Sequence, residues 1–345
     1  MNLPLRIVYV GPLWEGGTCL MRMRALERLN HKVIPMDTEP QQITGIVSRI
    51  MNKLGYPIDI WHVNQQLIVA AKQQKPNIVW IDKVLIIWPD TLQAIKRLNS
   101  ETIMVGYSPD DMAQRHNQSK YWLNGLNLYD VYFTTKTYNA IELRAMGAKY
   151  PIFISNAYDP ETHRPIPITS EERLALGSPV GFIGAWEYDR AEKMLALASS
   201  GIKVRMWGWQ GRADWVNKHP NLIVENKPLW SHDYTKAICS FDIALCFLRK
   251  INRDRQTTRS IEIPACGTFM LAERTDEHLE LFEEGKEAEF FSSTEELIEK
   301  THFYLSNENL RKKIAAAGRE RCIRSGYDYP SRMRWMLDKV REIYR

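Results

Sequence analysis

The sequence predicts an α/β protein built from two doubly wound, Rossmann-like domains that face an interdomain cleft. The chain has 345 residues, and a domain usually takes roughly 100–200 residues, so two domains are expected. Short, continuously apolar segments alternate with amphipathic segments along both halves, which is typical of a parallel sheet covered by helices on both faces. A segment with four prolines, residues 156–179, interrupts this alternation and is the best candidate for a linker.

The N-terminal half begins with LRIVYVG, an apolar run ending in glycine that predicts the first strand. Runs such as NIVWIDK and TIMVGYS repeat this pattern, and the segments between them place apolar residues at helical spacing. Strands are predicted at residues 5–11, 31–37, 77–83, 102–108, 130–135 and 151–156, and helices at 18–30, 41–54, 61–74, 89–98 and 138–146.

The same alternation restarts after the proline-rich segment, beginning with VGFIGA. It predicts strands at residues 180–185, 203–209, 221–226, 241–248, 267–273 and 288–293. Helices are predicted at residues 190–199, 231–239, 260–266, 294–305, 309–325 and 331–344.

Composition and charge exclude several classes of protein. Apolar residues make up 44% of the chain and charged residues 25%, which is ordinary for a globular protein. The net charge of +5 is mild, and a nucleic-acid binder would concentrate its charge over a whole face, so no nucleic-acid partner is expected. The longest apolar runs are too short to span a bilayer, and no stretch shows a strong basic amphipathic pattern.

The cysteines and the first residues point to the cytoplasm. The five cysteines are odd in number and show no CxxC spacing, which favours reduced thiols. The first residues lack the apolar core and cleavage site of a signal peptide. No HxH or HExxH cluster is present, so no metal site is expected.

Two glycine-containing loops follow predicted strands and are candidates for binding an anionic ligand. In GPLWEGGTC, Gly16 and Gly17 let the backbone approach a ligand at the start of a helix, although a plain tight turn explains them equally well. In VGFIGAWEYDR, Gly184 precedes a loop, and Arg190 stands at the mouth of the next helix, where it either reaches a phosphate or is solvated.

The segment 247–291 is the richest in candidate binding residues. Five cations lie in or beside its first loop, where they would repel one another without an anionic partner; they are Arg249, Lys250, Arg253, Arg255 and Arg259. Asp254 and Glu262 are separated by seven residues. A carboxylate in the first turns of a helix can accept hydrogen bonds from ribose hydroxyls, while cations and exposed amides meet a diphosphate.

The segment TTRSIEIPACGTFMLAERTDEHLELFEEGKEAEFF resembles the C-terminal signature of bacterial group-1-like glycosyltransferases, which include the spore-maturation glycosyltransferases. DVYFTTKTYNAIELRAMGA and ISNAYDPETHRP are similar to the same family, so the resemblance covers roughly residues 100–325. It implies the GT-B fold, with an N-terminal acceptor-side domain at 1–160 and a nucleotide-sugar-binding domain at 161–325. It also implies that the last segment, 326–345, returns to the N-terminal domain as a helix.

The resemblance implies roles for particular residues. Glu262 matches the carboxylate that recognises ribose, and Asp254 stands where the family has a Glu that contacts the transferred sugar. Arg190 matches a phosphate-binding cation, and the second cation is one of Arg249, Lys250 and Arg253. Thr257 and Thr258 would turn their amides toward the distal phosphate, beside Arg259.

The implied reaction moves a sugar from a UDP-, GDP- or dTDP-linked donor to a hydroxyl of a saccharide, protein or small molecule. It needs no cofactor or metal, because fixed cations and amides stabilise the departing diphosphate. Asp110, Asp111 and His116 follow a predicted strand and are candidates for an acceptor-side base, although a helix cap explains them as well.

Three alternatives remain open. They are a sugar-nucleotide epimerase of the same fold, a two-domain sugar-binding protein without catalysis, and a nucleic-acid binder. The scattered histidines, the missing signal peptide and the charge pattern argue against each of them in turn.

Overall fold

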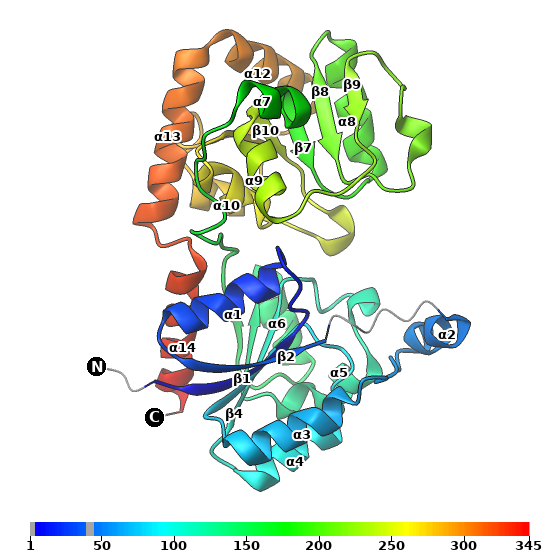
Figure 1. The fold of residues 1–345 in the computed structure, drawn as a ribbon, viewed down its shortest axis with the longest axis vertical. Coiled ribbons are helices and arrows are strands. Elements are labelled where there is room, and N and C mark those ends of the chain that lie inside the picture. Colours follow the sequence, from blue (N-terminus) through cyan, green and yellow to red (C-terminus); the bar gives the residue numbers. More distant parts are fainter. Residues whose placement is uncertain (1–3, 39–44, 345) are drawn as a thin grey trace. The chain divides into compact units, whose positions relative to one another are not determined.

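The computed structural model describes residues 4–38 and 45–344, and the chain divides into two compact units (Figure 1). The N-terminal unit runs to Ser155 and also includes the end of the chain from Tyr329. The C-terminal unit is Asn156–Asp328. Each unit contains one six-stranded parallel sheet with flanking helices, which confirms the predicted α/β class.

The sheet of the N-terminal unit has the strand order β2-β1-β3-β4-β5-β6. Its strands are β1 (Arg6–Gly11), β2 (Lys32–Asp37), β3 (Ile78–Asp82), β4 (Ile103–Ser108), β5 (Val131–Thr134) and β6 (Pro151–Phe153). Val8 on β1 lies opposite Ile34 on one neighbour and Val79 on the other. The central strands are buried on both faces, so their side chains form the core and their sequences are continuously apolar.

Helices cover both faces of this sheet, with α1 and α14 on one side and α3 and α4 on the other (Figure 1). The helices are α1 (Thr18–Arg28), α2 (Ile46–Leu54), α3 (Val63–Gln74), α4 (Pro89–Leu98), α5 (Lys120–Gly125), α6 (Thr137–Ala145) and α14 (Tyr329–Ile343), with 3₁₀ turns η2 (Arg115–Asn117) and η3 (Leu126–Leu128). The helix predicted at 41–54 is described from Ile46, and its residues 41–44 lie outside the described part.

The sheet of the C-terminal unit has the order β12-β11-β10-β7-β8-β9. Its strands are β7 (Ser178–Ile183), β8 (Val204–Trp207), β9 (Leu222–Val224), β10 (Phe241–Cys246), β11 (Phe269–Glu273) and β12 (Glu289–Phe291). From β7 the chain adds β8 and then β9 at one edge of the sheet, and then crosses back so that β10 lies on the other side of β7. The order of the strands therefore reverses between β7 and β10.

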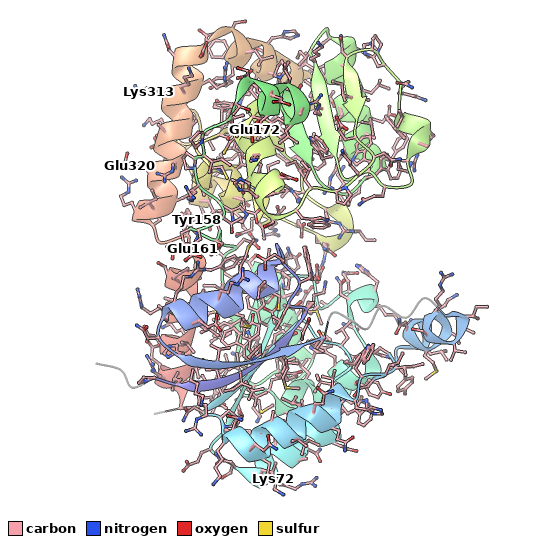
Figure 2. All side chains as sticks on the ribbon, viewed as in Figure 1. Lys72, Tyr158, Glu161, Glu172, Lys313 and Glu320 are labelled. Atoms are coloured by element: carbon pink, nitrogen blue, oxygen red, sulfur yellow. The ribbon has the colours of Figure 1, made fainter. Side chains whose placement is uncertain are left out.

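The helices of this unit are α7 (Ser170–Leu176), α8 (Tyr188–Ser199), α9 (Ser231–Cys239), α10 (Arg259–Ala265), α11 (Asp276–Leu281), α12 (Thr294–Ser306) and α13 (Glu308–Arg324), with 3₁₀ turns η4 (Ala213–Trp215) and η5 (Lys250–Asn252). The segment 156–179, expected to be a linker, is instead built into the unit. Thr169 and Glu172 form a capping box that starts α7. Glu172, labelled in Figure 2, also forms an ion pair of 2.7 Å with Lys236 on α9.

The state of the cysteines and the lengths of the helices bear on two further expectations. All five cysteines are free thiols, and only Cys239 is not fully buried. No helix among the described residues is long and apolar enough to cross a membrane.

Candidate functional site

The loops that follow β7, β10 and β11 share one edge of the C-terminal sheet, because these parallel strands are neighbours. Open parallel sheets bind ligands beyond the carboxyl ends of their strands, at the point where the strand order reverses. That point lies between β7 and β10. The candidate site is therefore built from the loop 184–187, the loop 247–258 and the helices α8 and α10 that follow them.

Two arginines meet at this edge. Arg190 on α8 and Arg259 at the start of α10 each hold their guanidinium less than 6 Å from the ring centre of Phe182, at 5.7 and 5.8 Å. Arg190 is only 1% exposed, and its Nη1 donates to the carbonyl of Ala185 at 3.1 Å. No described residue accepts a hydrogen bond from Nε or Nη2 of Arg190, or from Nε of Arg259.

Burial and the neighbouring charge of Arg259 lower the pKa of Arg190 to about 10. Arg190 still carries its charge at neutral pH, so the site holds a buried cation whose donors are only partly used. Buried polar groups are normally hydrogen-bonded, and buried charges are normally paired. An anion with several acceptor oxygens would satisfy both guanidinium groups.

Carboxylates from α8 and its cap hold the cations of the loop after β10. Glu187 accepts a hydrogen bond from Nε of Arg249 at 3.2 Å and lies 3.8 Å from Nη2 of Arg190. Asp189 pairs with Lys250 at 2.9 Å. Arg249 and Lys250, both predicted as ligand-binding cations, are thus already tied to carboxylates.

The loop between β10 and α10 is closed by backbone and side-chain hydrogen bonds. The amide of Asp254 donates to the carbonyl of Arg249 at 3.1 Å, and the Asp254 carboxylate accepts from the Arg249 amide at 3.3 Å. Arg253 adopts a left-handed backbone conformation with φ 46° at the end of η5. Asp254 lies in this loop, five positions before the first residue of α10, whereas Glu262 lies on the helix.

Glu262 is buried and held by two residues from distant segments. Tyr234 on α9 donates its hydroxyl hydrogen to Oε2 of Glu262 at 2.5 Å. Nε2 of His163 lies 3.8 Å from Oε1, while Nδ1 of His163 accepts from the amide of Asp159 at 3.0 Å. Because Nδ1 is an acceptor, the neutral imidazole carries its proton on Nε2, directed toward Glu262.

Burial and the charge of Glu262 raise the pKa of Tyr234 well above its ordinary value. Tyr234 therefore stays protonated and remains a donor. A carboxylate offers about four acceptor positions, so Glu262 can accept further hydrogen bonds from a ligand. Sequence reasoning missed Tyr234 and His163, because they lie 28 and 99 residues from Glu262 and share no local pattern with it.

Gly184 follows β7 where space is limited. A Cβ there would come within 2.7 Å of the Phe182 ring, and a Cβ at Gly208 would come within 2.7 Å of the Gly184 carbonyl oxygen. Any side chain at position 184 would therefore push Phe182 out of place beneath the two arginines. The glycine thus shapes the platform on which Arg190 and Arg259 rest.

Residues 190–338 match the family model described as Glycosyl transferase-like. The matched region begins at Arg190 and contains Asp254, Arg259 and Glu262. Among curated proteins, none matches the chain in sequence.

The chain is similar over its length to solved structures. HepE from Anabaena in complex with UDP-glucose has a TM-score of 0.62 at 12% identity, covering 98% of this chain and 100% of that chain. A glycosyltransferase from Rickettsia africae has a TM-score of 0.66 at 14% identity, covering 100% of both chains. An α-glucosyltransferase in complex with UDP-glucose and DNA has a TM-score of 0.68 at 13% identity, covering 99% and 100%.

These likenesses show the GT-B fold and confirm that part of the prediction. Together with the family match, they bear out a glycosyltransferase-like enzyme of the GT-B fold. The narrower resemblance to spore-maturation glycosyltransferases stays a prediction.

The start of α10, in the C-terminal unit, is supported by a buried histidine. Nδ1 of His278 donates to the carbonyl of Glu273 at 2.6 Å, so its Nε2 accepts from the hydroxyl of Ser260 at 2.7 Å. Ser260 in turn accepts from the amide of Thr257 at 3.0 Å. The amide of Arg259 donates to Oγ1 of Thr257 at 3.1 Å. The predicted loop residue Thr257 is therefore fixed by α11.

Lowering the pH is expected to destabilise the C-terminal unit through His278. Burial lowers the pKa of His278 from 6.5 to about 4, so the unfolded chain binds the proton first as the pH falls. The contribution is fully present above pH 6.5 and decreases as the pH falls toward 4, by about 3 kcal/mol in total. Denaturant unfolding between pH 7.5 and 4.5 measures this loss.

His278→Gln should show a shallower pH dependence of the unfolding free energy than the wild type. Equal slopes for His278→Gln and the wild type would contradict the assignment.

The predicted residues Gly16 and Gly17 belong to the N-terminal unit. Gly16 has φ 86°, which favours glycine, and the amide of Gly17 donates to the carbonyl of Trp14 at 3.0 Å. Gly17 is also the N-cap of α1, and a Cβ there would meet the Trp14 ring at 2.9 Å. The loop has the geometry of a tight turn, with the Gly17 amide already used inside it.

The predicted acceptor-side residues follow β4 in the same unit and differ in their surroundings. Asp110 pairs with Lys83. Asp111 is buried and accepts from Nδ2 of Asn139 at 2.8 Å, which fixes α6 to this loop. His116 lies exposed in η2. In the described residues, no three His, Cys, Asp or Glu side chains are arranged to hold a metal ion.

Proposed function

We propose that this chain transfers a sugar from a UDP-linked donor to a hydroxyl acceptor, and that its C-terminal unit binds the donor. The observation that carries this proposal is the pair Arg190 and Arg259, two close guanidinium groups with unused donors at the strand-order reversal. A diphosphate supplies two adjacent anionic groups and several acceptor oxygens, which this pair needs. HepE and the α-glucosyltransferase, which share the fold, were solved with UDP-glucose.

Negative charge on the leaving diphosphate increases as the glycosidic bond breaks. Fixed cations in a water-poor site stabilise that charge without reorganising during the reaction. Arg190 and Arg259 are proposed for this role, and the amide of Thr258 is proposed to face the distal phosphate. The amide of Thr257, predicted for the same role, already donates to Oγ of Ser260. The transfer is proposed to need no metal.

Glu262 is proposed to accept hydrogen bonds from the ribose hydroxyls of the nucleotide. Its carboxylate keeps acceptor capacity after the bond from Tyr234, and His163 lies on its other oxygen. Asp254 is proposed to contact the transferred sugar from the loop before α10.

The N-terminal unit is proposed to handle the acceptor. Asp111 holds α6 in place, so Asp110 and His116 are the remaining candidates for a base after β4. The acceptor is proposed to be a saccharide, a protein or a small molecule that offers a hydroxyl group.

A thermal-shift panel with UDP, GDP, dTDP, ADP and CMP, with and without Mg²⁺, tests the donor site. A ligand at 100 times its Kd adds about 2.7 kcal/mol to stability. We expect UDP to raise the unfolding temperature with or without Mg²⁺, and Glu262→Gln to remove this increase. Glutamine keeps the volume and one acceptor oxygen of Glu262, so the variant tests the loss of the negative charge and of the second acceptor oxygen.

Glu320→Gln is the matched control, since Glu320 lies exposed on α13 (Figure 2), and it should keep the full shift. No shift with any nucleotide would overturn the donor-site proposal and favour a sugar-binding protein. Turnover of a UDP-sugar without any acceptor hydroxyl would favour an epimerase.

A further inference from the structure

Helix α2 exposes its apolar side and buries only one of its residues, the polar Ser48. Ile46, Val47, Ile50 and Leu54 are 76, 67, 52 and 59% exposed, whereas Ser48 is the residue of this helix that is buried. At about 3.6 residues per turn, the four apolar residues fall within an arc of roughly 100°. A surface helix of a globular protein normally turns such an arc inward.

The helix is held at its C-terminal end, so its outward orientation has a structural cause. The carbonyl of Gly55 accepts from the amide of Lys120 at 2.7 Å, and the Tyr56 ring packs edge-on against Tyr121 at 5.5 Å. Figure 1 shows α2 standing away from the sheet of the N-terminal unit. The apolar arc therefore has no sheet beneath it to cover.

Aromatic and apolar side chains continue beyond the helix. Tyr56, Ile60 and Trp61 are exposed in the segment between α2 and α3. We call α2 together with these residues the α2 surface; it consists of Ile46, Val47, Ile50, Leu54, Tyr56, Ile60 and Trp61.

The charge of this segment has one sign. Arg49 and Lys53 are exposed on α2 beside the apolar arc, and residues 45–58 contain no Asp or Glu. The next carboxylate, Asp59, accepts from the amides of Val63 and Asn64 at 2.8 and 2.9 Å and caps α3. The cations next to the apolar arc therefore have no carboxylate in their own segment.

We propose that the α2 surface docks this chain onto an anionic lipid bilayer. An interfacial helix places its apolar face among the acyl chains and its cations among the headgroups. Trp and Tyr favour the same depth, where the apolar ring and the polar tip meet different surroundings. With nine residues, α2 is too short to span the bilayer, so it would lie in the plane of the surface.

A second copy of the chain fits this surface less well. A two-fold contact brings each patch against its own copy. Arg49 and Lys53 would then face Arg49 and Lys53 of the other copy, and the segment offers no carboxylate to separate them. An anionic headgroup layer complements both the apolar arc and the charge.

Co-sedimentation of the full chain with vesicles tests the proposal. We expect binding to vesicles of phosphatidylcholine mixed with phosphatidylglycerol, and much weaker binding to phosphatidylcholine alone. Arg49→Glu with Lys53→Glu should weaken binding to the anionic vesicles by about 25-fold or more, since each cation contributes roughly fivefold. Ile46→Ser with Ile50→Ser should weaken it by roughly tenfold or more, through loss of buried apolar area.

Ile141→Ser is the matched control, because Ile141 is 78% exposed on α6 of the same unit; it should bind like the wild type. Absence of binding to anionic vesicles, or equal loss in the Ile141→Ser control, would overturn the proposal. Concentration-dependent self-association that Ile46→Ser with Ile50→Ser abolishes would also overturn it, in favour of a contact between copies. The thermal shift with UDP should be the same in all these variants, so this test and that of the donor site fail separately.

Discussion

Replacing Arg190 with methionine should remove most of the donor binding and leave the folded chain as stable as the wild type, or more stable. The Arg190 guanidinium is buried beside Arg259, and no described residue accepts a hydrogen bond from its Nε or Nη2. In the absence of ligand this charge is costly, because desolvation is only partly compensated. Methionine fills a similar volume without a charge.

With the donor bound, the same arginine would face the diphosphate. Loss of one well-placed group that stabilises the transition state typically costs 10²–10³-fold in kcat, and a comparable loss in kcat/KM is expected for Arg190→Met. Thermal unfolding without ligand and steady-state transfer with a UDP-sugar measure the two effects. Lys193→Met on the same helix serves as the control and should keep kcat/KM.

Lower stability together with full activity in Arg190→Met would show that Arg190 has a structural role and would contradict this assignment. If Arg190→Met loses activity and its stability is unchanged or higher, Arg190 serves ligand binding and does not stabilise the fold.

Replacing Arg22 with methionine should destabilise the N-terminal unit by about 3–5 kcal/mol. Arg22 on α1 forms two hydrogen bonds with Asp82 at the end of β3, at 2.7 and 3.0 Å, and both residues are buried. Tyr9 donates to the same carboxylate at 2.5 Å. Without Arg22, the charge of Asp82 would remain buried with Tyr9 as its neighbour, and such a charge is far more costly than a buried pair.

Arg22→Met combined with Asp82→Asn should recover much of this loss, because the uncompensated charge is gone. Hydrogen exchange followed for residues 78–82 of β3 reports the stability of this unit separately from that of the other. A small effect of Arg22→Met, or no recovery in the double variant, would contradict the expected dependence on the buried charge. Arg24→Met, at an exposed ion pair with Glu15, is the control and should change stability little.

The alternation of apolar and amphipathic segments was enough to predict both parallel sheets, because strands buried on both faces must be continuously apolar. The sequence prediction of a donor site rests on Gly184 and Arg190 after one strand and on Glu262 after another, and it stays a proposal. Local patterns carry this information, since each residue stands at a fixed distance from a strand end.

The partners of these residues were not predictable in the same way. Tyr234 and His163 meet Glu262 only because α9 and the segment after Asn156 pack against α10. Glu187 and Asp189 bind the cations after β10 only because β10 returns to lie beside β7. These contacts depend on strand order, which periodicity does not specify.

The outward orientation of the apolar side of α2 could not be predicted from the sequence either. The prediction that no stretch shows a strong basic amphipathic pattern overlooked IVSRIMNKL, which has an apolar arc beside Arg49 and Lys53. An inward apolar face is the usual expectation for such a helix. Whether that face meets the protein or its surroundings depends on how Gly55 and Tyr56 attach the helix to α5.

Helix α14 (Tyr329–Ile343) follows the C-terminal unit in the chain but completes the N-terminal unit. It packs against α1, and Tyr329 at its start lies with its ring 5.7 Å from the Arg22 guanidinium. During synthesis, the six strands of the N-terminal unit therefore lack α14 until the residues after Asp328 have been made, while Asn156–Asp328 can already fold as a contiguous stretch. The nascent N-terminal half would leave the ribosome with one face of its sheet incompletely covered, and its exposure to chaperones should end only after α14 has been synthesised.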